Sequence, residues 1–504
     1  MPEPSSLLLG IGGIVGLGLL IARRNAGWLP ALGAFLGPLL LMIVALIGWV
    51  ALDIEPAMAP WDGVRLAPSM ALRLGWSIYP PADRGAVLGW IYGPIAALFY
   101  LPATLAGEPW AMILAGRFLS WVGYFGPVAW LLGREARRGR MPMTTAVILF
   151  GSFAILTDHS PALRYASTAI LADNPAIGLG AVALGSLGLP EGGKPGRRLA
   201  LAMFLATLAA WSKQLAWPIV ALVGVRAWMI QGGKAAARLA LIPLAVSVGL
   251  LLIFGWREIV LNLVTIPSRH PWHTTGGRPM AVALGAAFRA DAWILVVLLA
   301  GWWLRDRRIP ILRTTWSGFA IASMLALPIA SAGFLKVGGD VNSLAHALYP
   351  GAIAALLVVG GAIQGRPFLG WLLLAGASIL AWGRSEGLPE SLARPGRDWR
   401  DESRQVSRAL QGNPGLNYFP CHPLEHLAID RRPFHQEYGV FDRDLAGIPL
   451  DPDHLRSGIP AGARRLVYPM GRTYAGYFMR RALPEFRKED PDPSLPGAAC
   501  YVRD

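Results

Sequence analysis

The sequence is poor in charge. Only 15% of its 504 residues are Asp, Glu, Lys or Arg, whereas 54% are hydrophobic. Soluble domains carry roughly 25% charged residues, so the composition excludes an ordinary soluble protein. Apolar runs of the length that crosses a bilayer, about 20 residues, recur along the chain. We therefore expect a polytopic α-helical membrane protein.

Acidic residues are scarcer than basic ones. The chain has 31 Asp and Glu against 46 Lys and Arg, a formal charge of +15. Residues 1–383 hold 28 Lys and Arg against 14 Asp and Glu, whereas residues 384–504 hold 18 against 17. A basic surplus is typical of nucleic-acid binding, but these basic residues lie in short loops between apolar runs, where they orient the chain in the membrane. We expect membrane lipids and no nucleic acid as partners.

The chain has only two cysteines and no evident internal repeat. Both cysteines, Cys421 and Cys500, lie in the last quarter of the chain. A location outside the cytoplasm permits a disulfide, and two unrelated buried thiols are the alternative, so their pairing stays open. No internal repeat is evident, which weighs against a transporter built from two related halves.

The distribution of basic residues predicts which loops face the cytoplasm. The first apolar run, residues 7–22, has no positive charge before it and is followed by Arg23 and Arg24. This is the reverse of a signal peptide, so we expect a retained span with an outer N-terminus. With about 12 or 13 membrane helices predicted, the inner loops are residues 134–140, 194–198, 234–238, 305–313 and 364–366, and the outer loops are residues 53–89, 158–173, 257–289 and 336–346.

Two apolar segments are irregular. Residues 90–106 contain Pro94 and Pro102, which interrupt a helix, so we predict a broken or re-entrant piece rather than a full span. Residues 199–230 form an apolar stretch with Ser212, Lys213 and Gln214 at its centre. We predict two short helices that meet at Lys213 on the outer side.

The character of the chain changes after residue 383, where hydrophobic runs shorten to strand length. Residues 416–419 and 465–468 predict strands, and residues 398–410 predict an amphipathic helix. We expect two domains, a multi-span membrane domain (1–383) and a small extracytoplasmic α/β domain (384–504). Aromatic and histidine clusters at 418–423 and 434–438 have two interpretations, an acceptor groove and domain core.

The polar segment 53–89 follows an apolar run, residues 28–52, and carries Asp53, Glu55, Asp62 and Asp83. Charges beside hydrocarbon are costly and are kept for a function. Asp62 begins a short amphipathic stretch, where a carboxylate can take the proton of an acceptor hydroxyl. A helix N-cap is the alternative for Asp62.

The second outer loop supplies another acidic position. Asp173 begins the next apolar run, so an N-cap is again the alternative. With Asp62 it forms a candidate site for a divalent cation, Mg or Mn, to which Asp158 is a further candidate oxygen ligand. The same loop supplies His159 and Arg164 as candidate substrate-binding residues.

Cations suited to a phosphate group lie at matching places. Lys213, Arg269 and Lys336 are the candidate phosphate-binding residues, because a departing phosphate needs positive charge. Lys213 lies between two apolar stretches and so needs an anion or water nearby; a Lys that reaches the interface is the alternative. His270 and His273 offer a zinc pair only weakly, since no third ligand is adjacent.

Residues 336–342 contain two adjacent glycines that let backbone amides approach a phosphate or a sugar, with a plain tight turn as the alternative. Asp340 and Asn342 in this loop, and His270 before it, are therefore candidate substrate-binding residues.

The arrangement resembles the GT-C superfamily of membrane glycosyltransferases. Four segments carry the resemblance: Asp62 in WDGVRLAPSMALRLGWSIYP, the Tyr-Gly-Pro segment at 92–94, Asp173 in LADNPAIGLG, and Lys213 with Gln214 in AWSKQLAWP. The resemblance implies that Asp62 is the base or a metal-linked carboxylate, that Asp173 supports the site and that Lys213 contacts the donor phosphate. Tyr92 and Gln214 are expected to bind substrate. The chain departs from the family in having Trp61 and Gly63, and no second acid, beside Asp62.

The resemblance further implies transfer of a hexose or pentose from a polyprenyl-phosphate sugar to an acceptor hydroxyl. The acceptor is expected to be an envelope glycan, lipid or protein at the outer face of a bacterial plasma membrane. Two other functions stay open. A transporter or lipid flippase also places charges at span ends, and an O-antigen-ligase-like transferase would depend on Arg269 and His270 instead of Asp62.

Overall fold

The computed structural model describes residues 59–187, 195–272, 284–285, 288–289, 291–304, 314–382, 399–469, 478–489 and 498–503. The predicted spans 7–22 and 28–52, and the predicted outer N-terminus, lie outside these residues. So do Asp53, Glu55 and His273, and the predicted boundary at residue 383.

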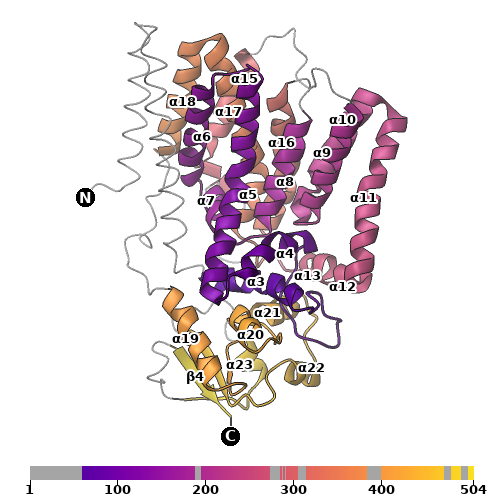
Figure 1. Cartoon of the computed structure of the whole chain (residues 1–504), viewed down its shortest axis with the longest axis vertical. Coiled ribbons are helices and arrows are strands. Elements are labelled where there is room, and N and C mark those ends of the chain that lie inside the picture. Colours follow the sequence, from indigo (N-terminus) through magenta and orange to yellow (C-terminus); the bar gives the residue numbers. More distant parts are fainter. Residues whose placement is uncertain are drawn as a thin grey trace, which may run out of the picture.

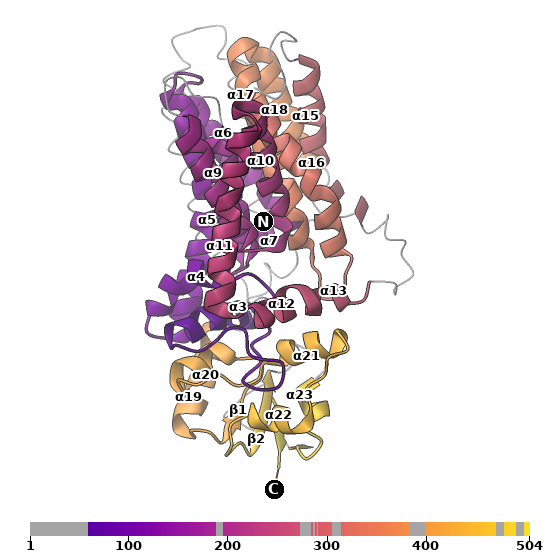
Figure 2. The same ribbon diagram turned by 90° about the vertical axis from the view of Figure 1, so that its right-hand side faces the viewer.

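A bundle of long helices stands over a smaller C-terminal α/β domain (Figures 1 and 2). This arrangement confirms the predicted fold class, a polytopic helical protein with a small C-terminal domain. The helices of the bundle are α5 (Pro109–Arg137), α6 (Met143–Asp158), α8 (Asp173–Ser186), α9 (Pro195–Ala210), α10 (Trp217–Gln231), α11 (Gly233–Phe254), α15 (Ala292–Leu304), α16 (Thr315–Phe334), α17 (Ala345–Gly365) and α18 (Pro367–Trp382).

Apolar sequence and helix length give these helices their membrane character. Within the described residues, three helices are long and apolar enough to cross a membrane: α11, α16, and α17 with the 3-10 turn η6 (Val341–Leu344) before it. A fourth is reached if α6 and α7 (Pro161–Thr168), bent by 107°, form one span. The predicted total of 12 or 13 includes segments outside the described residues and stays a prediction.

Burial separates the centre of the bundle from its edge. In α17, 83% of the most apolar window is buried, whereas in α11 the share is 11%. The exposed side of α11 is apolar and includes Leu252 and Ile253. This side therefore suits contact with lipid.

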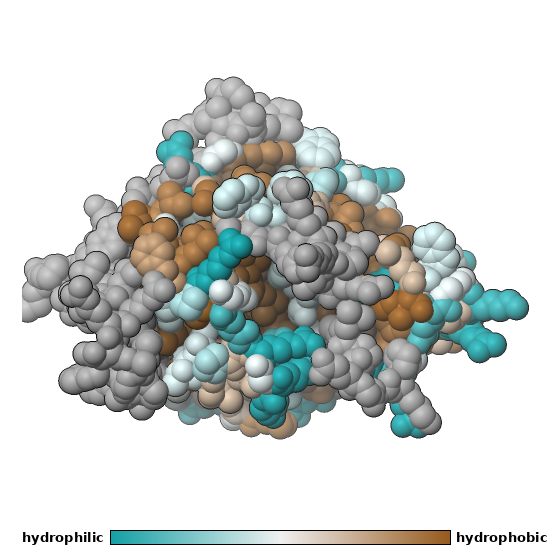
Figure 3. All heavy atoms as spheres, turned by 90° about the horizontal axis from the view of Figure 1, so that it is seen from above, coloured by the Kyte–Doolittle hydropathy of each residue, from teal (hydrophilic) through white to brown (hydrophobic). Residues whose placement is uncertain are grey.

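The basic loops within the described residues gather at one end of the bundle. The ends of α5, α10 and α17 that carry the basic loops point away from the C-terminal domain (Figure 1). Seen from that end, hydrophilic side chains stand among hydrophobic ones (Figure 3). The starts of α8 and α10, and with them the candidate site, lie at the opposite end.

Both irregular segments have the predicted form. Residues 94–105 make a short helix α4 (Pro94–Tyr100) followed by the 3-10 turn η2 (Leu101–Leu105). A segment of 12 residues rises about 18 Å as helix, too little to cross the apolar core. Between α9 and α10, the chain turns through Lys213 and the 3-10 turn η3 (Gln214–Ala216), so the apolar stretch is two helices.

A close backbone contact joins these two irregular segments. Gly93 N donates to Ser212 O at 3.2 Å, and Ile95 N donates to Trp211 O at 3.3 Å. A Cβ atom at Gly93 would lie 1.7 Å from Trp211 O, so only glycine permits this approach. The contact fixes the start of α4 beside the turn that carries Lys213.

Short elements lie between the bundle and the C-terminal domain. These are α3 (Ala59–Arg73), α12 (Trp256–Val260), the π-helical turn η4 (Leu261–Thr265) and α13 (Ile266–Arg269). The α3 helix packs against α5 on one side and against the C-terminal domain on the other, with the ring of Trp61 stacked 4.0 Å from that of Tyr438.

The C-terminal domain has the predicted strands and helix. Its four-stranded sheet has the order β1-β2-β4-β3, with β1 and β2 parallel and the other neighbours antiparallel. Its elements are α19 (Trp399–Gly412), β1 (Asn417–Tyr418), α20 (Pro423–Ile429), α21 (Glu437–Leu445), α22 (Pro452–Ser457), β2 (Arg465–Pro469), α23 (Phe478–Ala482), β3 (Arg487–Lys488) and β4 (Ala498–Val502).

The two cysteines of this domain form no disulfide with each other. Cys421 and Cys500 are both buried and belong to different apolar clusters. Of the two alternatives left by the sequence, unrelated buried thiols is the one observed. Tyr418 and Phe419 are also buried in these clusters, which favours domain core over acceptor groove for them.

The Gly93 contact gives a stability prediction. We expect Gly93→Ala to lower the melting temperature in detergent by about 5 °C or more, because the new methyl group overlaps the Trp211 carbonyl. Gly107→Ala is the matched control, since a Cβ there meets no atom within 4 Å. Equal melting temperatures for the two variants would contradict the close approach.

Candidate active site

Asp62 is held in the interior by two contacts. Its Oδ2 accepts from Arg117 Nε at 2.6 Å and its Oδ1 accepts from Ile170 N at 2.8 Å. Asp62 is fully buried, and Arg117 on α5 is 1% exposed. The carboxylate therefore ties α3 to α5 and to the segment that leads into α8.

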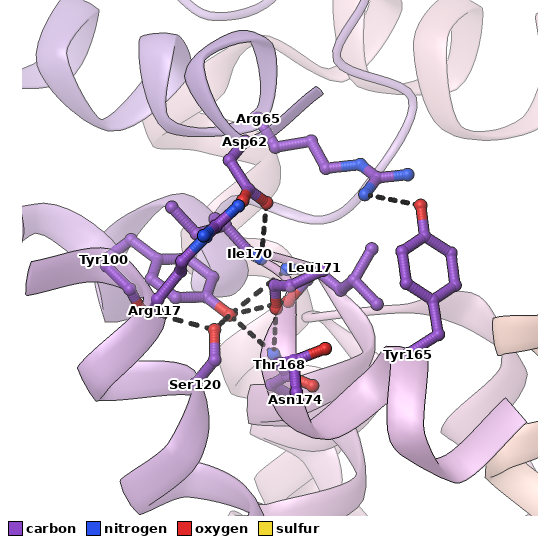
Figure 4. Close-up of polar contacts among 12 residues, drawn as sticks. Asp62, Arg65, Tyr100, Arg117, Ser120, Tyr165, Thr168, Ile170, Leu171 and Asn174 are labelled. Carbon is purple, nitrogen blue, oxygen red and sulfur yellow. Dashed lines mark hydrogen bonds and ion pairs between the residues drawn. The ribbon is translucent and has the colours of Figure 1, made fainter. Parts of the chain in front are cut away.

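Tyr100 fastens the same segment from α4 (Figure 4). Its hydroxyl donates to Leu171 O at 2.9 Å, accepts from Asn174 Nδ2 at 3.0 Å and lies 2.8 Å from Ser120 Oγ. Segment 169–174 is thus bound by α3 through Asp62, by α4 through Tyr100, and through them to α5. Asp173 belongs to this segment, so its position depends on the Asp62 and Tyr100 contacts.

Asp173 is the centre of a second buried cluster. Lys213 Nζ lies 2.7 and 2.8 Å from its two carboxylate oxygens. Asn342 Nδ2 donates to Oδ2 at 2.8 Å and His346 Nε2 contacts Oδ1 at 3.0 Å. All four side chains are at most 6% exposed. The structure therefore brings together three predicted residues, Asp173, Lys213 and Asn342, and adds His346.

Tyr92 lies beside this buried cluster, at the end of the bundle that faces the C-terminal domain (Figure 1). Lys213 Nζ lies 5.4 Å from the centre of the Tyr92 ring. Burial raises the pKa of Tyr92 to about 12, and the ionisable groups around it are Arg65, Asp173, Asp442 and Asp340. The phenol therefore stays protonated at neutral pH, as a hydrogen-bond donor among charges.

Gln214 positions the loop that carries Tyr92. Its Nε2 donates to Ile91 O at 3.1 Å and to Leu263 O at 2.9 Å. The predicted substrate-binding amide is therefore engaged by the backbone of the Tyr92 loop and of η4.

Arg65 is a cation that the sequence did not single out. Its Nη1 donates to Tyr165 OH at 3.1 Å, and its guanidinium lies 5.2 Å from the centre of the Trp61 ring and 5.7 Å from that of Tyr165. Arg65 therefore adds a second positive charge near Tyr92, besides that of Lys213.

Asp442 brings an acidic group from the C-terminal domain. Its Oδ1 lies 3.8 Å from His270 Nε2, and the same nitrogen is 3.3 Å from Asp442 O. Burial disfavours the charged form of each group. It therefore raises the pKa of Asp442 to about 8 and lowers the pKa of His270. At neutral pH the pair is therefore a protonated carboxyl beside a neutral imidazole.

The other predicted phosphate ligands, Lys336 and Arg269, and the predicted substrate-binding residue Asp340 have different surroundings. Lys336 Nζ donates to Pro267 O at 2.8 Å and Ser268 O at 3.1 Å, so it satisfies carbonyls at the end of α13. Arg269 is exposed. Asp340 is exposed and accepts from Val341 N at 2.6 Å as the N-cap of η6. The structure thus gives Lys336 and Asp340 structural partners, and it leaves Arg269 at the surface.

The predicted residues at the end of α6 contact one another and their own helix. Arg164 Nε lies 3.7 Å from Asp158 Oδ1, and His159 Nδ1 lies 2.8 Å from Ile155 O. These contacts form the bend between α6 and α7. Their predicted part in substrate binding stays a prediction.

The described carboxylates do not offer a metal site in this arrangement. Both oxygens of Asp62 and of Asp173 contact N–H groups of Arg117, Ile170, Lys213, Asn342 and His346. Within the described part of the chain, no group of three or more His, Cys, Asp or Glu residues is placed to hold a metal ion. The donor set therefore does not fit the predicted shared Mg or Mn ion.

Fold and site together define a class of protein. The chain is a polytopic helical protein. Its buried, paired carboxylates and cations gather at the end of the bundle that faces a small α/β domain. No protein-family model matches the chain, and no curated protein matches its sequence.

Solved structures of an archaeal oligosaccharyltransferase from Archaeoglobus fulgidus are similar in overall shape. The apo form aligns with a TM-score of 0.45 and 13% identity over 93% of this chain and 73% of the other. A structure of AglB from the same organism, in complex with an inhibitory peptide and a dolichol-phosphate, aligns with a TM-score of 0.44 and 12% identity over 94% and 74%. A similarity of this degree identifies neither a family nor an activity for the chain.

Asp442 gives a pH prediction. The pKa of Asp442 is about 8 in the folded state, whereas the usual value for Asp is near 4. Between about pH 4 and pH 8, the folded state therefore binds a proton that the unfolded state lacks. The stabilisation is complete below about pH 4 and is lost as the pH rises through about 8, with a slope of up to about 1.4 kcal/mol per pH unit.

We expect the melting temperature of the wild type to fall between pH 5 and 8 more steeply than that of Asp442→Asn, which cannot titrate. Scanning fluorimetry in detergent measures both. Parallel curves for the two proteins would contradict the buried, protonated carboxyl.

Proposed function

We propose that the chain is a membrane glycosyltransferase that moves a single sugar, a hexose or pentose, from a polyprenyl-phosphate donor to an acceptor hydroxyl. The reaction takes place at the end of the bundle that faces the C-terminal domain, on the outer face of a bacterial plasma membrane. An envelope glycan, lipid or protein is the proposed acceptor.

One observation carries the proposal. Two buried carboxylates, Asp62 and Asp173, are connected through segment 169–174 at the end of the bundle that faces the C-terminal domain. Buried charges beside hydrocarbon are costly and are kept for function. Each carboxylate has its own cation, Arg117 for Asp62 and Lys213 for Asp173. The pairing supplies the negative and positive groups that sugar transfer from a phosphate requires.

The reaction exchanges one C–O bond for another. The acceptor oxygen attacks the anomeric carbon, the bond from that carbon to the phosphate oxygen breaks, and the acceptor proton passes to a carboxylate, for which we propose Asp62. We propose that the Lys213 ammonium, while it still contacts Asp173, also stabilises the negative charge of the departing phosphate, and that Arg65 is a second cation for that phosphate. No step of this reaction runs through a metal ion.

The arrangement sets a condition on Asp62. A carboxylate has roughly four acceptor sites on two oxygens, so the contacts with Arg117 and Ile170 leave acceptor capacity for a hydroxyl. Its complete burial requires a local opening between α3 and its neighbours before an acceptor arrives. Arg117 and the Ile170 amide would keep the carboxylate in one orientation during that opening.

A lipid-linked donor also suits the surroundings of the site. The outer surface of α11 is apolar, and the broken segment 94–105 and the Lys213 turn bring polar groups to the end of the bundle. A transporter or flippase would place such groups near the middle of the membrane. The gathering of polar groups at one end favours an enzyme at the surface.

The first test separates chemistry from structure at Asp62. We expect Asp62→Asn to reduce transfer from a polyprenyl-phosphate sugar by about 100-fold or more, as loss of a base does. Because Asp62→Asn also removes the anion beside Arg117 and costs stability, the double variant Asp62→Asn with Arg117→Gln is the matched control. It should regain melting temperature and remain inactive. A stable double variant with normal transfer would show that Asp62 has only a structural part.

Lys213 gives a second test. We expect Lys213→Gln to lower transfer by about tenfold or more, since a cation at the leaving phosphate is lost. Lys234→Gln, at the start of α11 on the opposite end of the bundle, is the control and should leave transfer unchanged. Transfer is measured in proteoliposomes with radiolabelled donor. Equal rates for the two variants would remove Lys213 from the proposed mechanism.

A further inference from the structure

A second polar cluster lies where residues 82–87 cross the C-terminal domain. Arg443 Nη1 donates to Ala82 O at 2.8 Å, and His454 Nε2 donates to Gly85 O at 2.8 Å. These two buried side chains bind the loop through its main chain. They take no part in the site around Asp62 and Asp173.

The next residues of the loop are bound by two neighbours in the domain. Val87 N donates to His435 Nδ1 at 3.0 Å, and Gln436 N donates to Val87 O at 2.9 Å. His435 in turn lies 3.0 Å from His454 O through its Nε2. Loop 82–87 is therefore fastened to four buried residues of the C-terminal domain, all at most 4% exposed: His435, Gln436, Arg443 and His454.

Several polar atoms of this cluster have no hydrogen-bond partner among the described residues. They are Nε and Nη2 of Arg443, both amide atoms of Gln436, and Nδ1 of His454. A buried group without a partner costs about 1–3 kcal/mol, and a charged one more. Five such atoms beside one loop need a physical explanation, and an ion is one of those expected.

The unpartnered atoms of Arg443 have a defined geometry. Nε and Nη2 form one edge of the planar guanidinium, the fork that holds two oxygens of one oxyanion side by side. Burial lowers the pKa of Arg443, as expected for a cation whose charge has no close anion. The other buried ionisable groups of the cluster, His435 and His454, carry no negative charge, and Asp83 of the loop is exposed.

Gly439 lies four residues before Arg443 on α21 and so shares its side of the helix, and Gln436 is the extended residue immediately before the helix. Gly439 meets Gly89 of the loop so closely that a Cβ on Gly89 would lie 2.9 Å from Gly439 N. The loop and the helix touch through glycine backbone here, and the Gln436 side chain lies beside this contact.

We propose that this cluster binds one phosphate group that keeps a proton, held by the Nε and Nη2 edge of Arg443. Gln436 Nε2 is a further donor to the phosphate oxygens. Because His454 Nε2 donates to Gly85 O, its Nδ1 is an acceptor in the neutral ring. That nitrogen and Gln436 Oε1 can accept a hydrogen bond from the P–O–H group. A carboxylate or a sulfate has no such donor at neutral pH.

The unpartnered atoms are closed to solvent, so phosphate enters only as loop 82–89 lifts from α21. The Gln436 amide makes no side-chain hydrogen bond and turns without losing one. This inference does not depend on the proposed sugar transfer. The proposed ligand is free phosphate, because a monoester has lost most of its last P–O–H proton by pH 7.

The experiment measures the melting temperature of the full chain in detergent at pH 7, with phosphate, glycerol phosphate, sulfate or acetate at equal ionic strength. We expect a saturable rise with phosphate that exceeds the rise with glycerol phosphate, sulfate and acetate, none of which offers a P–O–H donor in quantity at this pH. An equal or larger rise with glycerol phosphate would show that the site does not recognise the P–O–H proton and would contradict the proposal.

Variants locate the site. Arg443→Gln should abolish the phosphate-specific rise, and Arg456→Gln, an exposed arginine on the neighbouring α22, should keep it. Gln436→Ala loses no side-chain hydrogen bond and is expected to fold even if Arg443→Gln does not; its apparent Kd should be about tenfold weaker. No phosphate-specific rise in the wild type, or an equal rise in Gln436→Ala, would overturn the proposal.

Discussion

A carboxylate buried beside membrane helices has to be paired, and the position of segment 169–174 depends on two such pairings. Asp62, paired with Arg117, holds the amide of Ile170, while Asp173 within the segment is held by Lys213. Charges that are not paired at this depth cost several kcal/mol each. The pairing therefore decides how α3, α5 and α8 meet at the end of the bundle.

Irregular backbone makes room for these pairings. The proline-broken segment 94–105 and the turn at Lys213 end helices short of a full span, and both bring polar groups to the same level. Gly93 lets the two turns touch. The C-terminal domain then closes this end, with Tyr438 on Trp61 and Asp442 beside His270. Membrane bundle and domain thus contribute ionisable groups to one region.

Much of the fold could be predicted from the sequence because its signals are local. A lysine between two apolar stretches predicts the turn at Lys213, and two prolines predict the broken segment. Arg117 could not be found in this way, since it lies inside an apolar run and its partner is 55 positions away. Asp442 and His346 were missed for the same reason: burial and distant neighbours, which no local pattern records, give them their surroundings. Lys336 fits a phosphate ligand by charge, but its ammonium is used by carbonyls of α13.

The central claim is that the paired charges at the end of the bundle transfer a sugar from a lipid phosphate. The most direct measurement follows a polyprenyl-phosphate donor with a radiolabelled sugar in proteoliposomes that contain the purified chain and an envelope extract as acceptor. The account predicts that the label leaves the lipid fraction, that polyprenyl phosphate accumulates, and that the label appears on an acceptor. Movement of the intact donor between the two leaflets, without loss of its sugar, would contradict the account and favour a flippase.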